Sequence, residues 1–402
     1  MRDKDSYELI MQQGTEMIEF YRNNPCIAAY DLLRVDLAPV QRLVFEDMWF
    51  KNYVIAVASR GLGKSSSTDS LVLTDNGLVY LNEILPPIPS FLEPNSTIEI
   101  EHKQSLMTAY GMRNSKIVSL EKEITGLKLT TTNGFVHKGS AHHPLLILDS
   151  NGKFIYKKLS DFIPGDFVCI QRAQNIFGKN DIDLDDAYLI GLFLGDGCIY
   201  DRYKFVSITT SDDYILDFCN NYCKSRNISY RVDKDKRTKN THKIIFKNFG
   251  WFFEKYKIKR CLSYYKNIPF CIRTANFESQ KRFISGLFDT DGGVDGGGVS
   301  FCSTSYDLIK ESQLMLLNIG IVTKIRTKKT KSKFGHAFIL YMFSYDAKLF
   351  MDKIGFSLER KQKKLTEYFE TKKLNPNRDI IPHVKDLCIT KKFSSRQNLT
   401  YL

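Results

Sequence analysis

The feature that most constrains the fold of this chain is an internal repeat in its second half. The decapeptide YLIGLFLGDG at residues 188–197 returns 95 residues later as FISGLFDTDG at residues 283–292. Further positions match at nearly the same offset: Val206 with Val299, Ser211 with Ser305, Asp213 with Asp307 and Ile228 with Ile321. A near-constant offset indicates two copies of one supersecondary unit. We expect each copy, about residues 185–280 and 281–370, to form an α+β unit in the order αββαββα.

The two decapeptides resemble the paired motifs of LAGLIDADG homing endonucleases, and the resemblance covers residues 179–375. It implies a monomer with pseudo-twofold symmetry that binds double-stranded DNA and cuts both strands. Small residues let helices approach closely, as Gly191, Gly195 and Gly286 would here. Each helix would then bring its terminal carboxylate, Asp196 or Asp291, to a shared interface.

Two carboxylates held close together repel each other unless a divalent cation lies between them. Mg²⁺ takes oxygen ligands, keeps several waters and can activate water for attack on a phosphodiester. We therefore expect Asp196 and Asp291 to be catalytic residues and ligands of Mg²⁺. Asp289 is an alternative acid in the second motif, but it falls short of the end of the helix.

The net charge of +13 is concentrated in this second half of the chain. Basic residues alternate with β-forming residues in two clusters, one within residues 231–260 and one within residues 324–333. Strands with a cationic face are the electrostatic footprint of proteins that bind phosphate backbones. The family also implies a basic catalytic helper, for which the sequence leaves four lysines open: Lys243, Lys247, Lys331 and Lys333.

Residues 65–178 have a different pattern, with short β-forming runs separated by turn signals. The turn signals are Asn76-Gly77, Asn133-Gly134, Asn151-Gly152 and Pro164-Gly165-Asp166. An all-β domain is expected. Three segments in order resemble the N-terminal part of a Hint (intein) domain: an opening that ends in DSLVLTDNG, then SAHHPL at residues 140–145, then LSDFIPGDFV at residues 159–168.

The Hint resemblance implies protein splicing, which begins by moving the peptide bond before the intein onto a side chain. Ser65 would supply the hydroxyl. Serine is a weak nucleophile at neutral pH, so neighbouring groups must polarise the scissile amide. His143 would assist the leaving nitrogen, and Ser140 would bind the backbone near the junction.

Residues 1–64 end in an apolar strand followed by SRGLGKS, the pattern of a phosphate-binding P-loop. With Gln41 upstream, this segment resembles the start of the ATPase domain of phage terminase large subunits, although Ala58 stands where the first glycine is usual. The resemblance implies that Gln41, Gly61, Gly63 and Lys64 bind ATP in the reassembled host protein. A P-loop should open a helix, but the sequence after Lys64 favours a strand and a tight turn. We therefore expect an α/β fragment interrupted at Lys64.

An intein should close with a second β segment, a penultimate His and a terminal Asn, and residues 376–402 match none of these. We expect a truncated intein that does not splice alone, with a possible separate C-terminal fragment as partner. No apolar run suggests a membrane span, and scattered cysteines favour a cytoplasmic compartment. Three other readings stay open: a DNA-packaging ATPase, a LAGLIDADG module that binds DNA without cutting it, and an autoprocessing Hint protein.

Overall fold

The structure is a computed structural model. It describes residues 14–34, 66–84, 97–101, 104–108, 111–115, 117–121, 126–200, 205–234, 240–295, 298–330, 335–371 and 374. The chain divides into two compact units, Met1–Leu62 and Gly63–Leu402. Within the described residues, no helix is both long enough and apolar enough to cross a membrane.

In the first unit the described residues are helical. Residues 14–23 form a helix, and α2 (Pro25–Leu33) follows with proline in its first turn and Arg34 in the left-handed conformation at its end. Both are ordinary start and stop signals of helices. The α/β P-loop fragment expected for residues 1–64 rests on its strand and on Gln41, Gly61, Gly63 and Lys64, which all lie outside the described residues, as does Ser65.

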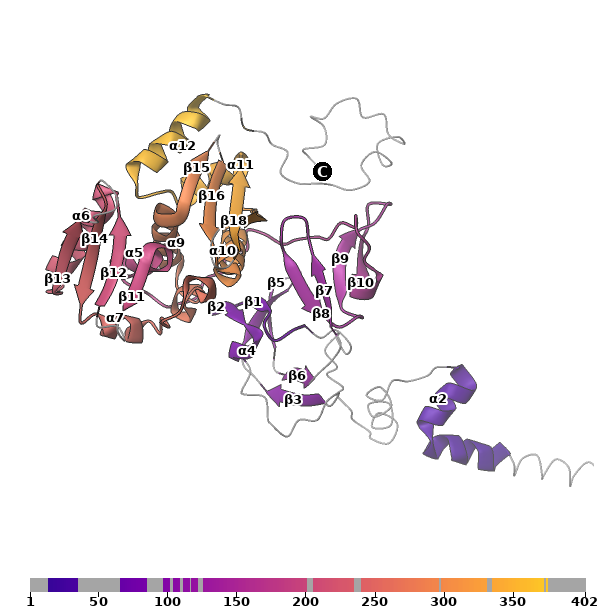
Figure 1. Ribbon diagram of the computed structural model, residues 1–402. Helices are drawn as coiled ribbons and strands as arrows, with labels where there is room; N and C mark the ends of the chain where they lie inside the picture. The colour runs from indigo at the N-terminus through magenta and orange to yellow at the C-terminus, as the bar shows by residue number, and fades with distance from the viewer. Residues whose placement is uncertain are drawn as a thin grey trace, which may run out of the picture. The chain divides into compact units, whose positions relative to one another are not determined.

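The first part of the second unit is built of short strands (Figure 1). They are β1 (Leu71–Thr74), β2 (Gly77–Tyr80), β3 (Thr97–Glu101), β4 (Ser105–Thr108), β5 (Gly111–Asn114), β6 (Ile117–Glu121), β7 (Leu127–Thr130), β8 (Val136–Gly139), β9 (Pro144–Leu148) and β10 (Phe154–Lys158). Strands β2-β1-β4-β5 form one sheet, and β3-β6, β7-β8 and β9-β10 are antiparallel pairs. Single turns of helix, α4 (Leu81–Ile84) and η1 (Leu159–Asp161), complete the region. The expected strand-rich character is present.

The turn signals of this region have the backbone that they predict. Gly77, Gly134, Gly152 and Gly165 all have φ between 76° and 103°, a conformation that disfavours residues with a Cβ. Gly77 has a second constraint, because a Cβ there would lie 2.6 Å from the carbonyl oxygen of Arg273. The β1–β2 hairpin therefore packs directly on a segment almost 200 residues later in the chain.

The first repeat begins with α5 (Leu184–Asp196) and has the expected order. Its further elements are β11 (Gly197–Tyr200), β12 (Phe205–Thr210), α6 (Asp213–Ser225), β13 (Tyr230–Lys234), β14 (His242–Lys247) and α7 (Gly250–Lys255), then η3 (Ser263–Tyr265) and α8 (Phe270–Arg273). The sheet order is β11-β12-β14-β13, and all pairs are antiparallel.

The second repeat begins with α9 (Phe277–Asp291) and repeats the order of the first. Its further elements are β15 (Gly292–Asp295), β16 (Gly298–Ser303), α10 (Tyr306–Ile319), β17 (Lys324–Lys329), β18 (His336–Phe343), α11 (Tyr345–Lys353) and α12 (Glu359–Thr371). The sheet order is β15-β16-β18-β17. The αββαββα order predicted from the repeat is thus found in both copies, with α5 and α9 between the two sheets (Figure 1).

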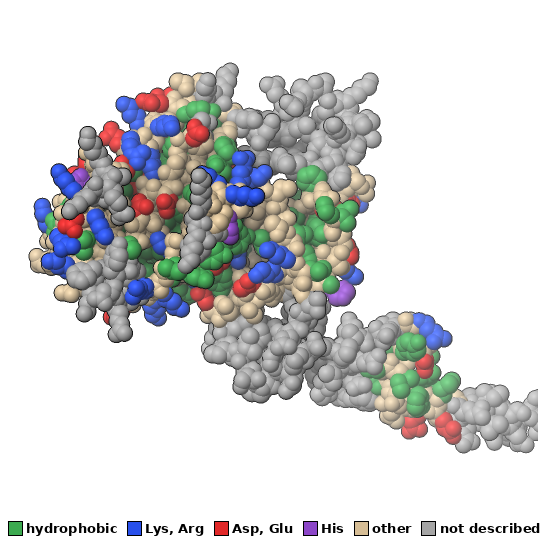
Figure 2. Space-filling view, in the orientation of Figure 1, with side chains coloured by type: hydrophobic (Ala, Val, Ile, Leu, Met, Phe, Trp, Pro, Cys, Tyr) green, Lys and Arg blue, Asp and Glu red, His purple; other side chains and the backbone are tan. Residues whose placement is uncertain are grey.

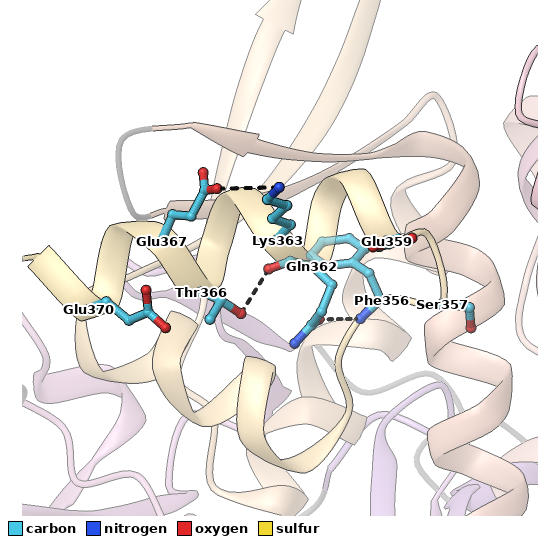
Figure 3. Close-up of a pocket in the computed structure, with 8 residues that line it drawn as sticks. All are labelled: Phe356, Ser357, Glu359, Gln362, Lys363, Thr366, Glu367 and Glu370. Atoms are coloured by element: carbon cyan, nitrogen blue, oxygen red, sulfur yellow. Dashed lines mark hydrogen bonds and ion pairs between the residues drawn. The ribbon is translucent and has the colours of Figure 1, made fainter.

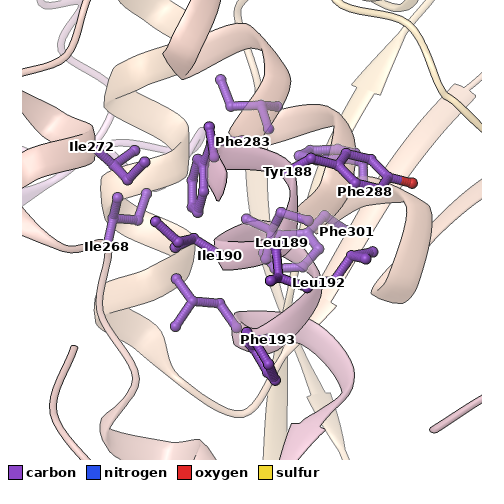
Figure 4. Packing of buried hydrophobic residues seen from close by; sticks show 14 of the residues in the cluster. Tyr188, Leu189, Ile190, Leu192, Phe193, Ile268, Ile272, Phe283, Phe288 and Phe301 are labelled. Atoms are coloured by element: carbon purple, nitrogen blue, oxygen red, sulfur yellow. The ribbon is translucent and has the colours of Figure 1, made fainter. Parts of the chain in front are cut away.

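Helices α5 and α9 pack so closely that their backbones touch. A Cβ at Gly191 would lie 2.4 Å from the carbonyl oxygen of Phe283, and one at Gly286 would lie 2.4 Å from that of Tyr188. The close approach expected from these glycines is therefore present. Around this seam, apolar side chains of both helices form one buried core with residues of both sheets (Figure 4).

The strand-rich region is docked onto the two repeats by a buried arginine. The Arg273 side chain is 1% exposed. It donates to the carbonyl oxygen of Leu78 at 3.0 Å and forms a two-pronged ion pair with Glu83 at 2.9 and 2.6 Å. Buried Glu311 of α10 lies 4.0 Å from the same guanidinium and accepts a hydrogen bond from Tyr80. These contacts join residues far apart in the sequence, so no local sequence pattern predicts them.

Candidate active site at the ends of two paired helices

The candidate site lies where α5 and α9 end. Asp196 is the last residue of α5 and Asp291 the last residue of α9. Each helix stops because the next residue, Gly197 or Gly292, is extended and opens the following strand. Gly195 makes room here, because a Cβ at that position would lie 1.9 Å from the hydroxyl of Thr290. The two helix ends therefore bring their terminal carboxylates to one interface, as the repeat suggested.

Burial changes the acidity of both carboxyl groups. Burial, and then repulsion from the charge of Asp291, raise the pKa of Asp196 to about 6. Burial also raises the pKa of Asp291 above its ordinary value, against the opposing charges of Lys266 and Lys361. Two acids held close together disfavour each other's ionised form. An added cation would relieve this repulsion.

Two lysines flank the carboxylates. Lys266 follows η3, and its ammonium donates to the carbonyl oxygens of Leu194 and Gly195 at 2.8 and 3.0 Å. Lys361 lies in the first turn of α12, and its ammonium donates to the carbonyl oxygens at the end of α9, including those of Asp289 at 2.7 Å and Gly292 at 2.6 Å. Each lysine thus caps the C-terminus of its own repeat's first helix, where the helix dipole favours a cation.

Both ammonium groups are held in poorly solvated surroundings. Burial lowers the pKa of Lys266 and lowers the pKa of Lys361 to about 8, while the neighbouring carboxylates oppose this change. A lysine with a pKa near 8 is still mostly protonated at pH 7. The site therefore pairs two acids with two cations that are hydrogen-bonded to the helix ends.

Sequence reasoning missed these two lysines. Lys243 and Lys247, two of the four lysines left open, lie in β14, and Lys331 and Lys333 lie outside the described residues. The lysines whose charges act on Asp196 and Asp291 are instead Lys266 and Lys361. A signal was present, because they are 95 residues apart, the same offset that separates the two carboxylates.

Asp289, the alternative acid, is held by hydrogen bonds within the protein. Its carboxylate accepts hydrogen bonds from the hydroxyl of Tyr188 at 2.7 Å and from the backbone amides of Ser357 and Leu358 at 3.1 and 3.2 Å. It is almost fully buried. These contacts tie the end of α9 to the segment that leads into α12, and hence to Lys361.

The donor set is compatible with Mg²⁺. The described residues contain no cluster of three or more His, Cys, Asp or Glu side chains that could hold a metal ion by themselves. Mg²⁺, however, commonly binds through one or two carboxylates and completes its shell with waters and substrate phosphates. Asp196 and Asp291 fit that pattern, since their pKa values stay raised in spite of the charges of Lys266 and Lys361. Cys219 and Cys223 are both buried in α6, which fits their reading as reduced thiols packed in a core.

Basic strands flank the helix ends and form the candidate nucleic-acid surface. In β17, Arg326, Lys328 and Lys329 are exposed, and Arg326 lies over the ring of Tyr341 at 5.1 Å. In β13, Arg231 is paired with Asp233 at 3.2 Å. Figure 2 shows many Lys and Arg side chains on the side of the molecule where β13 and β14 lie. Cationic sheet surfaces of this kind suit a phosphate backbone.

A hollow beside α12 is a different feature. It is lined by Phe356, Ser357, Glu359, Gln362, Lys363, Thr366, Glu367 and Glu370 (Figure 3). Its charged lining is mostly acidic, which repels phosphate, and neither Asp196 nor Asp291 belongs to it. The candidate site is therefore the pair of helix ends and not this hollow.

Two of the residues named for splicing, Ser140 and His143, lie in the turn that follows β8. Ser66, which follows Ser65, pairs with Gly139, and the amide of Ser67 donates to the carbonyl oxygen of Lys138 at 3.0 Å. Ser140 therefore directly follows β8, the strand with which Ser66 and Ser67 pair. Residues 140–143 form a turn in which the amide of His143 donates to the carbonyl oxygen of Ser140 at 3.0 Å.

A second histidine lies beside His143. The rings of His137 and His143 are 4.2 Å apart between centroids. Burial, and then the neighbouring imidazole, lower the pKa of His137 to about 4. Sequence reasoning did not single out His137, because it precedes the SAHHPL segment that carried the resemblance.

Comparison with known proteins decides part of the identity. A family model described as "LAGLIDADG-like domain" matches residues 183–257 and again residues 278–355. Residues 183–257 and 278–355 are thus each similar to a LAGLIDADG-like domain. The two matches begin just before α5 and just inside α9, so the LAGLIDADG-like copies coincide with the structural repeats.

Several curated proteins are similar to most of this chain. The replication factor C small subunit of Methanocaldococcus jannaschii is 26% identical over 80% of this chain and 17% of its own length. The helicase Hel308 of the same organism is 27% identical over 63% and 22%. A ribonucleoside-diphosphate reductase alpha subunit of Bacillus subtilis is 22% identical over 66% and 26%. The chain thus spans well under half the length of each of these relatives.

Solved structures with LAGLIDADG architecture also align with the chain. The homing endonuclease I-DmoI in complex with DNA and Ca is 18% identical, with a TM-score of 0.36, over 46% of this chain and 97% of that one. Full-length DUF199/WhiA from Thermotoga maritima is 13% identical, with a TM-score of 0.35, over 55% and 72%.

Proposed function

We propose that residues 179–375 form a Mg²⁺-dependent endonuclease that cuts both strands of a specific DNA duplex. The observation that carries this proposal is the matched pair of acids and lysines at the helix ends, Asp196 with Lys266 and Asp291 with Lys361. A module that only binds DNA has no need of two neighbouring carboxylates that repel each other.

Each group has a role in the proposed reaction. Mg²⁺, when bound by Asp196 and Asp291, supplies positive charge to the scissile phosphates and activates water. The ammonium groups of Lys266 and Lys361 add fixed positive charge beside the reacting phosphates, where little solvent screens it. The basic strands hold the DNA backbone and align the two strands with the two halves of the site.

The proposal is tested by changing both acids together. In Asp196→Asn/Asp291→Asn we expect duplex binding to persist while Mg²⁺-dependent cleavage falls below detection. Asp217→Asn is the control, because it removes a carboxylate from an exposed position of α6. Unaltered cleavage by the double variant would overturn the assignment of the site.

We further propose that this endonuclease is carried by an intein whose N-terminal splicing region is residues 65–178. The relatives support this reading, because proteins named for unlike tasks each match this chain over only part of their length. A segment shared in this way behaves as an inserted element. The contacts of Ser66 and Ser67 with β8 support this proposal, because Ser66 pairs with Gly139, the residue before Ser140.

The splicing proposal has its own test. Once Ser65 has formed an ester with the residue before it, a nucleophile such as hydroxylamine cleaves the chain after Lys64. We expect two fragments by mass spectrometry from the wild type and none from Ser65→Ala. A chain that keeps its full mass under this treatment contradicts the proposal.

The interrupted host is proposed to be a terminase-like ATPase, on the resemblance carried by Gln41, Gly61, Gly63 and Lys64. A replication factor C-like host is the second candidate, favoured by a match over 80% of the chain. The DNA that follows the codon for Leu402 distinguishes them, because the resumed host sequence belongs to one ATPase class or the other.

The rival for the second half is a LAGLIDADG module that recognises DNA without cutting it. It differs from the endonuclease in one result: binding without cleavage by the unaltered protein at any Mg²⁺ concentration.

A further inference from the structure

Helices α6 and α10 hold the same place in the two repeats. The residue before each helix contacts the segment of the other repeat that contains Lys266 or Lys361. Asp212 is the N-cap of α6 in the first repeat, and Ser305 is the N-cap of α10 in the second. The hydroxyl of Ser305 donates to the backbone carbonyl oxygen of Lys266 at 2.5 Å. The Ser305 hydroxyl oxygen also accepts a hydrogen bond from the backbone amide of Leu308 at 3.2 Å, so Ser305 caps its own helix as well. The second repeat therefore fixes the backbone of the first repeat's lysine.

The opposite contact runs from the first repeat to the second. The carboxylate of Asp212 forms a two-pronged ion pair with Arg360, at 2.7 and 2.9 Å. Arg360 immediately precedes Lys361 in the first turn of α12. In the structure the counterpart of Ser305 is Asp212, and not Ser211 as the sequence match indicated, because Asp212 and Ser305 are the two helix N-caps. Each of them reaches the segment around the lysine of the other copy.

Stability does not account for the orientation of Asp212. Its side chain makes no capping hydrogen bond to α6, although Asp is among the preferred N-cap residues. The ion pair that replaces the cap is partly exposed, since the side chain of Arg360 is 62% exposed, and exposed pairs contribute little to stability. The ion pair does define where the first turn of α12 lies, and with it Lys361.

We propose that Ser305 and Asp212 are positioning residues that act across the repeats: Ser305 orients Lys266, and Asp212 orients Lys361 through Arg360. The proposal rests on the endonuclease function. Its consequence is that each half of the site is complete only when the other repeat is docked against it, and that the two strand cuts can be weakened separately.

The test measures the cleavage rate of each strand on a duplex labelled on both strands. Small misplacements of a catalytic group cost on the order of a hundredfold in rate. We therefore expect Ser305→Ala to slow one strand by about tenfold to a hundredfold, and Arg360→Ala to slow the other strand by a similar factor. Ser305→Thr, which keeps a hydroxyl, restores the first strand. Asp212→Ala matches Arg360→Ala, and the double variant is no slower than either.

A structural role alone gives a different pattern. Equal slowing of both strands, slowing of the same strand by both kinds of variant, or no slowing at all would overturn the proposal. Ser305 is fully buried, so Ser305→Ala is used only if it retains the wild-type circular dichroism spectrum. Otherwise the Asp212 and Arg360 variants, at a less buried pair, decide the outcome.

A second readout needs neither metal nor DNA. Lys266 and Lys361 are modified with an amine-reactive acetylating reagent in the free protein, and the rate at each is followed by mass spectrometry. We expect Arg360→Ala to raise the rate at Lys361 at least fivefold without changing Lys266. Unchanged rates at both lysines overturn the proposal. If the wild type cuts neither strand, the endonuclease function fails while this readout still tests the positioning.

Discussion

The backbone of Gly286 in α9 lies against the backbone of Tyr188 in α5, so closely that a methyl group at Gly286 would meet the Tyr188 carbonyl oxygen at 2.4 Å. Neither partner is a flexible side chain that could turn away. The position of both terminal carboxylates depends on this seam, because Asp196 and Asp291 end the two helices.

We therefore expect Gly286→Ala to destabilise the protein, although alanine is the better helix former. Overpacking of a tight core costs about 1–3 kcal/mol, more than the roughly 1 kcal/mol that alanine gains in helix propensity. Urea unfolding followed by circular dichroism measures the difference. Gly126→Ala is the control, since a Cβ there has only an ordinary contact at 3.5 Å. Equal stability of the two variants would refute close backbone packing at the seam.

Arg273 joins the strand-rich region to the two repeats, and its loss should be costly. Arg273→Met leaves Glu311 buried without its cation, and breaking a buried pair in this way costs about 3–5 kcal/mol. The free energy of unfolding in urea reports this. Lys348→Met is the matched control, because its partner Asp352 lies on an exposed helix face and such pairs are worth under about 1 kcal/mol. A similar small loss for both variants would contradict a buried role for Arg273.

His137 should make the folded protein less stable as the pH falls below 6.5. Its pKa is about 4 in the folded protein and 6.5 ordinarily, so the unfolded chain binds the proton more readily. The contribution of the neutral imidazole is complete above pH 6.5 and is lost as pH falls from 6.5 towards 4. We expect His137→Gln to lose less stability than the wild type between pH 7 and pH 5, measured as the shift in urea midpoint. An equal or larger loss in the variant would mean that His137 is not held neutral.

The basic strand β17 should contribute to DNA affinity through phosphate contacts. Each such contact contributes about 0.9 to the slope of log affinity against log salt concentration. We expect Lys328→Ala to reduce the magnitude of this slope by about 1. Arg231→Ala should change it less, because Asp233 already neutralises that guanidinium. Fluorescence anisotropy at several salt concentrations gives both slopes, and a larger effect of Arg231→Ala would place the main contact on the other sheet.

The sequence was sufficient for the order of elements in both repeats and for the ends of α5 and α9. Regular apolar spacing defines those helices, and Gly-Asp-Gly and Asp-Gly end them. The turn glycines of the strand-rich region could also be predicted from the sequence, because a backbone with positive φ favours glycine at that position.

The rest depends on contacts that local patterns do not encode. Lys266 follows a short 3₁₀ turn, and Lys361 lies in the first turn of a helix. Neither lysine therefore belongs to a segment whose regular spacing of apolar residues predicts its position. Arg273 meets Glu83 across 190 residues of sequence. The P-loop assignment and the role of Ser65 stay predictions, since those residues lie outside the described part of the chain.

The most direct measurement of the central claim is single-turnover cleavage of a duplex that carries the uninterrupted host sequence around the codon for Lys64. The unaltered protein is mixed with DNA labelled on both strands, with Mg²⁺ or with a chelator. We predict that both strands are cut with Mg²⁺, that neither is cut with the chelator, and that Asp196→Asn/Asp291→Asn binds without cutting. Binding by the unaltered protein with no cut in either strand at any Mg²⁺ concentration would contradict it and favour a DNA-binding module.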